Sequence, residues 1–262
     1  MTVQKLHALA DAMKNYALES NFVIGFYISG SYAKGLIHDR SDLDPVFVVD
    51  KGAKEQVGQD LRKRFDLKNC DLCVYTLDEF RNLSTAGTSG MGSDRYDYAH
   101  LTVEIDKTGG EIQKIVEQNG SLSERERLYL GAGYLDGYIN SFYRSLKAAR
   151  EKWDLPQRLE AAESIPHMLA FLFAADHRIV PFSKYLEWDM KKHPLNFPME
   201  PDELLRDIKT VLSSASVATQ IKLFEKVSEF ASKVGFENIV KDWDGKPEAL
   251  ANKMKKYPEG CL

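Results

Sequence analysis

The stretch ISGSYAKGLIHDRSDLDPVFVVD, residues 28–50, holds a serine and two aspartates whose side chains suit phosphate and metal binding. Gly30 permits a tight turn after an apolar run, and Ser31 follows with a hydroxyl beside backbone N–H groups. If residues 31–35 begin a short helix, its N-terminus is a site for an anion such as phosphate. We therefore expect Gly30 and Ser31 to hold phosphate oxygens.

Asp42 and Asp44 stand at the head of the next apolar run, two positions apart. A strand there would place both carboxylates on one face. Two such carboxylates repel each other unless a cation lies between them, and Mg²⁺ or Mn²⁺ is the hard divalent ion that oxygen ligands suit. A phosphate cradle beside a carboxylate pair predicts a site for a metal-bound nucleoside triphosphate, with the ion bridging carboxylates and phosphates.

A third acid is wanted on a neighbouring strand, to complete the metal shell or to accept the proton of an attacking hydroxyl. Asp71, in CDLCVY, is our prediction for this position because it adjoins an apolar strand. Asp106 is the rival because it ends another expected strand. The sequence DKTGG that begins at Asp106 favours a turn acid there, but the choice between the two stays open.

The triphosphate also needs cations, because its charge of about −4 is only partly neutralised by one or two Mg²⁺ ions. Lys34 follows the glycine turn, and we expect it at the phosphates. Arg144 and Lys147 are three positions apart in an expected long helix, so they share one face. That face either reaches the triphosphate or is an ordinary solvated surface.

The first half of the chain shows both helical and strand patterns. Pro45 opens one apolar run, and because proline removes a ladder N–H, that strand should begin late or lie with an unpaired edge. The expected elements are a helix over 3–19, strands over 22–28 and 45–49, a helix over 52–67, a strand over 70–76, a short helix over 77–83 capped by Thr76, a mobile loop over 84–94 and a strand over 98–105.

Beyond Gly120 the pattern is helical throughout. Ser123 and Glu126 form a capping-box signature that opens a long helix, and further helices are expected over 164–179, 201–216 and 219–234. The predicted fold class is therefore α+β: a mixed-sheet domain over residues 1–118, followed by an all-α helical bundle over 119–262. We expect the active cleft between the two.

Composition limits the classes of function. The 262 residues, 44% hydrophobic and 28% charged, are those of a globular protein. The net charge of −4 argues against binding to long nucleic acid but allows a small anionic ligand. No long apolar run predicts a membrane span and no export signal opens the chain, so we expect a cytoplasmic protein. Cys70, Cys73 and Cys261 are expected to be reduced thiols rather than metal ligands or a redox pair.

The interval from Gly30-Ser31 through ten residues to Asp42-Leu43-Asp44 resembles the signature of the nucleotidyltransferase superfamily typified by DNA polymerase beta. GSYAKG and SDLD are especially similar to its small-molecule branch, which includes aminoglycoside and lincosamide adenylyltransferases and the minimal nucleotidyltransferases. The match covers residues 22–78.

This resemblance implies specific roles for the candidate residues. Asp42 and Asp44 would be metal ligands, Ser31 a phosphate contact and Asp71 the third carboxylate. Lys184, in RIVPFSKYLEWDM, resembles a lysine with which adenylyltransferases bind phosphate. The helical half is similar in kind to the C-terminal domain that members of this branch often carry.

The activity implied is Mg²⁺-dependent transfer of a nucleoside monophosphate, AMP from ATP, to a hydroxyl of a small-molecule acceptor such as an aminoglycoside-like compound. Pyrophosphate would be released. Two alternatives remain: an antitoxin-type enzyme that AMPylates a protein side chain, and a non-catalytic nucleotide-binding module with this fold. The presence of all three acids favours an enzyme, whereas the acceptor, the base preference and the oligomeric state stay open.

Overall fold

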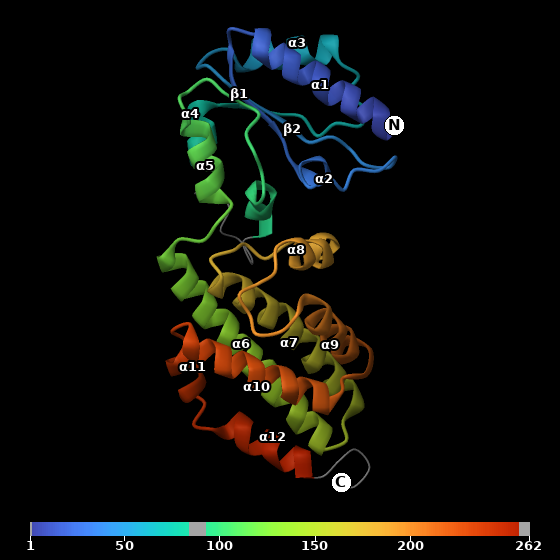
Figure 1. Ribbon diagram of the computed structural model, residues 1–262, viewed down its shortest axis with the longest axis vertical. Coiled ribbons are helices and arrows are strands. Elements are labelled where there is room, and N and C mark those ends of the chain that lie inside the picture. The colour runs from blue at the N-terminus through green and yellow to red at the C-terminus, as the bar shows by residue number, and fades with distance from the viewer. Residues whose placement is uncertain (1, 84–92, 257–262) are drawn as a thin grey trace. The chain divides into compact units, whose positions relative to one another are not determined.

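The computed structural model describes residues 2–83 and 93–256, and the chain divides into two compact units, Met1–Ser121 and Leu122–Leu262 (Figure 1). The first unit combines helices with a small mixed sheet and the second is all-α, so the predicted α+β fold class is confirmed. The expected loop over 84–94 lies largely outside the described residues. In the described part of the chain, no helix is both long and apolar enough to cross a membrane.

A four-stranded sheet in the order β3-β2-β1-β4 forms the centre of the first unit. β1 pairs antiparallel with β2 and β4, and β2 pairs parallel with β3. The elements of this unit are α1 (Val3–Glu19), β1 (Val23–Ile28), α2 (Gly30–Ala33), β2 (Pro45–Val49), α3 (Lys54–Arg64), β3 (Cys73–Thr76), α4 (Leu77–Asn82), the 3-10 helix η1 (Ser93–Tyr98), β4 (Ile105–Asp106) and α5 (Glu111–Asn119).

Both faces of the sheet are covered, because alternate residues of each strand point to opposite sides. Phe47 and Val49 of β2 pack with the apolar stripe of α1 and with α3. Val46 and Val48 pack on the other face with side chains of α4 and α5. In Figure 1, α1 and α3 accordingly lie together on one side of the sheet. We refer to the second face as the α4/α5 face.

The expected strand over 98–105 is wrong for most of its length. Only Ile105–Asp106 forms β4, and pairing with β1 begins at Glu104, whose N–H donates to the Phe26 carbonyl. The Val103 N–H is instead bound by the Gln113 side chain at 3.0 Å. The backbone N–H of Val103, which a longer strand would have used in its ladder, therefore donates to a side chain of α5.

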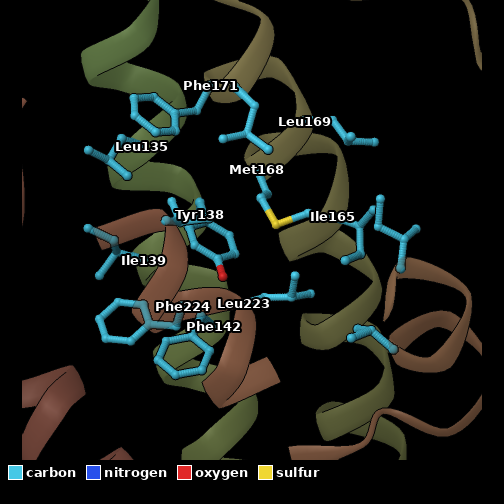
Figure 2. Packing of buried hydrophobic residues seen from close by; sticks show 14 of the residues in the cluster. Leu135, Tyr138, Ile139, Phe142, Ile165, Met168, Leu169, Phe171, Leu223 and Phe224 are labelled. Carbon is cyan, nitrogen blue, oxygen red and sulfur yellow. The ribbon is translucent and has the colours of Figure 1, made fainter. Parts of the chain in front are cut away.

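The second unit is a helical bundle around the long antiparallel hairpin of α6 and α7. Its elements are α6 (Glu124–Arg150), α7 (Asp154–Ala175), the 3-10 helix η2 (Ser183–Tyr185), α8 (Leu186–Lys192), α9 (Pro201–Ser214), α10 (Val217–Lys233), α11 (Glu237–Lys241) and α12 (Lys246–Lys256). Figure 2 shows the core between α6, α7 and α10, where the Phe142 and Phe224 rings stack with centroids 4.3 Å apart.

α7 begins ten residues earlier than the expected helix over 164–179, at Asp154. Pro166 lies inside it, although an internal proline removes one hydrogen bond and costs about 3 kcal/mol. Fully buried residues such as Met168 and Phe171 follow it in the same helix. We infer that burial of this apolar surface outweighs the loss at the proline.

Lys107 ties the end of α1 to β4, and this contact gives a stability prediction. Its ammonium donates to the carbonyl oxygens of Ala17, Leu18 and Ser20 at 2.9, 3.2 and 2.8 Å. A cation there satisfies orphan carbonyls and complements the helix dipole. We expect Lys107→Met to lower the opening free energy of the last turn of α1 by about 1 kcal/mol, measured by amide hydrogen exchange.

Lys114→Met is the matched control, because Lys114 is an exposed lysine on α5 of the same unit. Its exchange profile along α1 should equal that of the wild type. Equal protection of α1 in the Lys107 variant would show that the three contacts contribute nothing to the end of this helix.

Candidate functional site

The adjoining ends of β1 and β2 bring the glycine turn next to Asp44. Ile28, the last residue of β1, pairs with Pro45, the first residue of β2. Ser29 follows, and its N–H and hydroxyl both donate to the Asp44 carbonyl oxygen, at 3.0 and 3.3 Å. Pro45 is tolerated because it is the first residue of its strand. The strand pairing thus places residues 29–31 beside Asp44.

Gly30 and the Asp44 carboxylate are packed directly against each other. Gly30 adopts a φ of +62°, in the left-handed region that favours glycine. A Cβ atom at this position would lie 1.9 Å from Asp44 Oδ2, well inside van der Waals contact. The half-buried Asp44 carboxylate therefore occupies space that only glycine leaves open.

Asp71 lies opposite Asp44 across the parallel strands. Leu43 bridges Cys70, and Val46 pairs with Cys73; both pairs differ by 27 in residue number. Asp44 and Asp71 have the same difference, and the Asp71 N–H donates to the Leu43 carbonyl at 2.9 Å. Paired residues of neighbouring strands point to the same side of a sheet, so both belong to the α4/α5 face.

Asp42 is an exposed residue directly before the bridged Leu43, and that its carboxylate shares a face with Asp44 stays a prediction. The thiol of Cys70 lies near these acids. Burial, with the negative charges of Asp66, Asp44 and Asp42, raises the pKa of Cys70 to about 11. The thiol is therefore protonated at neutral pH and unreactive. Cys70 and Cys73 are both free, whereas the third expected thiol, Cys261, lies outside the described residues.

A test of the metal prediction comes from the donor set itself. Within residues 2–83 and 93–256, no three His, Cys, Asp or Glu side chains gather closely enough to hold a metal ion. The aspartates therefore form no all-protein cage. Mg²⁺ is usually held by one or two carboxylates together with substrate phosphates and water. The oxygens of Asp42 and Asp44 fit that mode, and Asp71 as a metal ligand stays a prediction.

Lys34 is buried beside the Gly30 turn. The residue is only 3% exposed, and its ammonium donates to the Gly30 carbonyl oxygen at 3.4 Å. It also lies 4.8 Å from the centroid of the Tyr96 ring. Ser31, by contrast, is partly exposed at the start of α2. Of these two residues, only Ser31 presents a side chain toward solvent.

Asp106, the rival third carboxylate, has a structural role. Its Oδ1 accepts from the Thr108 N–H and hydroxyl, and its Oδ2 accepts from the Gln113 N–H at 3.0 Å. Burial tends to raise the pKa of the Asp106 carboxyl, but these hydrogen bonds outweigh it and lower the pKa below its usual value. The side chain therefore fixes the turn between β4 and α5.

These placements predict different results for the two acids. Asp71→Ala should lower turnover by about 10²-fold or more with nucleotide affinity nearly unchanged, as expected for a base or late metal ligand. Asp106→Ala should destabilise α5 by about 1–2 kcal/mol but leave the specific activity of the folded fraction close to wild type. Steady-state kinetics with urea unfolding checks both, and a larger loss of turnover in the Asp106 variant would reverse the assignment.

The predicted cations of the helical unit make contacts within that unit. Arg144 forms an ion pair with Glu160 of α7. The Lys147 ammonium lies 5.5 Å from the Tyr143 ring centroid, and the Lys184 ammonium 4.8 Å from that of Tyr185. All three cationic side chains are on exposed residues.

The structure does not bring these three cations together. Arg144 and Lys147 lie near the C-terminal end of α6, whereas Lys184 follows the C-terminal end of the antiparallel α7. That end of α7 is next to the start of α6, because the His177 ring contacts Glu124 at 3.4 Å. From Glu124 to Arg144 α6 rises about 30 Å at 1.5 Å per residue. One triphosphate therefore cannot contact both groups.

Two residues near the site were not predicted from the sequence. Ser29 holds the Asp44 backbone, and Tyr96 packs on Lys34. A serine before the glycine turn was a detectable signal for the first. Tyr96 had none, because it is 62 positions beyond Lys34 in the chain and only the tertiary fold joins them.

Comparisons with known proteins complete the description. No protein-family sequence model matches the chain, and no curated protein matches it in sequence. Among solved structures, the chain is similar to a nucleotidyltransferase-like protein from Exiguobacterium sibiricum, with a TM-score of 0.39 and 9% sequence identity. The alignment covers 97% of this chain and 81% of that one.

Proposed function

We propose that the protein is a nucleotidyltransferase that moves a nucleoside monophosphate, AMP from ATP, to a hydroxyl of a small-molecule acceptor. The observation that carries this proposal is the packing of the Asp44 carboxylate on the Gly30 α-carbon, with Ser29 bound to the Asp44 backbone. This contact joins the glycine-serine turn to Asp44, two positions from Asp42, at one end of the sheet. Such an arrangement suits a phosphate chain and a divalent ion side by side.

Each residue has a definite task in this reaction. Asp42 and Asp44 would hold Mg²⁺, which when bound neutralises charge on the phosphates and stabilises the displaced oxygen. Ser31 would donate its hydroxyl to a phosphate oxygen. Asp71, which lies just before β3 and opposite Asp44, would accept the proton of the acceptor hydroxyl. The carboxylates also repel anions in the absence of the ion, so Mg²⁺ should tighten nucleotide binding.

Transfer of label from nucleotide to acceptor tests the proposal directly. The full chain is incubated with Mg²⁺ and each α-labelled triphosphate, together with pooled hydroxylated metabolites and drugs, proteins, or no acceptor. Labelled product with release of pyrophosphate is the expected result, strongest with ATP and small molecules. Label on protein would identify a protein-modifying enzyme instead. Tight Mg²⁺-dependent nucleotide binding with no transfer under any condition would identify a non-catalytic module.

The helical cations give a further prediction about the triphosphate. Since one triphosphate cannot span both ends of α6, we expect only one of Lys147→Ala and Lys184→Ala to weaken ATP binding. The loss should be about 1–3 kcal/mol, as for a charge-assisted hydrogen bond. Calorimetry on the full chain measures both variants. If both variants weakened ATP binding equally, the result would contradict the distance between Lys147 and Lys184 in the second unit. If neither variant changed the affinity, the triphosphate would be bound by other residues.

A further inference from the structure

Lys34 is buried beside the Gly30 turn, although lysine is among the residues least often buried. Its ammonium reaches the Gly30 carbonyl oxygen at 3.4 Å and faces the Tyr96 ring at 4.8 Å. A desolvated ammonium needs partners of negative potential, and a carbonyl oxygen and an aromatic face both supply it. These contacts hold the Lys34 head group in one place next to the turn.

Gly30 contacts both Lys34 and Asp44 and so links the two side chains. The Gly30 carbonyl is bound by Lys34, and its α-carbon touches the Asp44 carboxylate so closely that a methyl group would not fit. A rotation of the Gly30 peptide would therefore move the surface on which the carboxylate rests. Ser29, one residue earlier, is bound to the Asp44 backbone, so the same movement would strain that hydrogen bond as well.

The Tyr96 ring, against which the Lys34 ammonium packs, is itself held in place. The ring is fully buried, with 0% exposure, and belongs to η1. The neighbouring Arg95 donates to the carbonyl oxygens of Asn119 and Gln118 at the end of α5, at 2.9 and 3.1 Å. Since η1 is anchored to α5 in this way, the position of Lys34 is set by a part of the chain remote in sequence.

We propose that Lys34 is a positioning residue that orients the Gly30 turn and, through it, the Asp44 carboxylate. Lys34 does not touch the nucleotide, which replaces the expectation that it binds the phosphates. The consequence for catalysis rests on the proposed function, whereas the structural link from Lys34 to Asp44 can be measured without it.

Amide exchange tests the structural link. Lys34→Met keeps the apolar stem and removes the charge. The Ser29 amide, which donates to the Asp44 carbonyl, should exchange at least about tenfold faster than in the wild type, and the Gly30 and Asp44 amide resonances should shift. Lys34→Arg restores a cation and should recover most of the protection. Lys51→Met is the control, because the Lys51 side chain is 91% exposed, and it should change none of these signals.

A second variant covers the case in which Lys34→Met does not fold. Tyr96→Leu removes the ring face while leaving Lys34 in place, and it should alter the same Ser29 and Asp44 signals. Unchanged signals in a folded Lys34→Met protein, or in Tyr96→Leu if only that variant folds, overturn the proposal. This outcome does not depend on whether the protein transfers nucleotides.

Nucleotide binding distinguishes positioning from direct contact. If Lys34 touched phosphate, Lys34→Met would weaken binding of metal-free ATP and flatten its dependence on salt. Positioning leaves both unchanged within about twofold, while the affinity gained on adding Mg²⁺ falls about tenfold because Asp44 is misplaced. Loss of metal-free affinity with a flattened salt dependence overturns the positioning role. A wild-type protein without any ATP affinity contradicts the proposed function instead, and Ser29 exchange still decides the role of Lys34.

Discussion

Asp44→Asn is expected to lower the rate of nucleotidyl transfer by about 10³-fold or more while leaving the first unit folded. The amide has the shape of the carboxylate but lacks the charge that a bound Mg²⁺ requires. The Ser29 hydrogen bonds go to the Asp44 backbone carbonyl, which the substitution retains, so the ends of β1 and β2 should stay paired. Single-turnover transfer from α-labelled ATP, with circular dichroism as the folding check, measures the effect.

Asp50→Asn is the matched control for this experiment. Asp50 is an exposed aspartate just after the other end of the same strand, β2, away from the glycine turn. The Asp50→Asn variant should transfer the nucleotide at the wild-type rate. Turnover near wild type in a folded Asp44→Asn protein would remove Asp44 from the metal site and, with it, the main support for the proposed function.

Gly30→Ala is expected to impair both activity and stability. The alanine Cβ would lie 1.9 Å from Asp44 Oδ2, so the carboxylate must move. The φ of +62° adds a backbone penalty of about 1–2 kcal/mol for a residue with a Cβ. We expect turnover to fall by about 10²-fold, typical of a misplaced catalytic group, and the unfolding free energy to fall by about 1–3 kcal/mol. Kinetics and urea unfolding of the full chain measure the two effects.

Gly35→Ala separates the backbone penalty from the displacement of Asp44. Gly35 has a similar φ of +68°, but a Cβ there would meet no atom within 4 Å. It should lose stability to a similar backbone penalty while its turnover stays close to wild type. Equal losses of turnover in both glycine variants would mean that contact with Asp44 is not what makes Gly30 necessary.

The sequence by itself determined the features that depend on neighbouring residues. Apolar spacing located α1, β1 and β2, and the capping boxes at Thr76 and Ser123 set the starts of α4 and α6. These signals are local because a cap binds within three residues and a stripe repeats within one or two turns. The spacing from Gly30 to Asp44 likewise identified the candidate site, since antiparallel neighbours place a turn beside the next strand.

Only the tertiary structure decided which side chains meet across longer distances. Most of the strand expected over 98–105 does not form, and the Val103 N–H donates a hydrogen bond to the Gln113 side chain instead. Lys34 is buried against Tyr96, a contact that the sequence did not predict. Local patterns report propensity and spacing, whereas burial and partner choice depend on which distant elements pack together. For that reason the sequence could name the candidate acids but could not show that Lys34 packs against Tyr96.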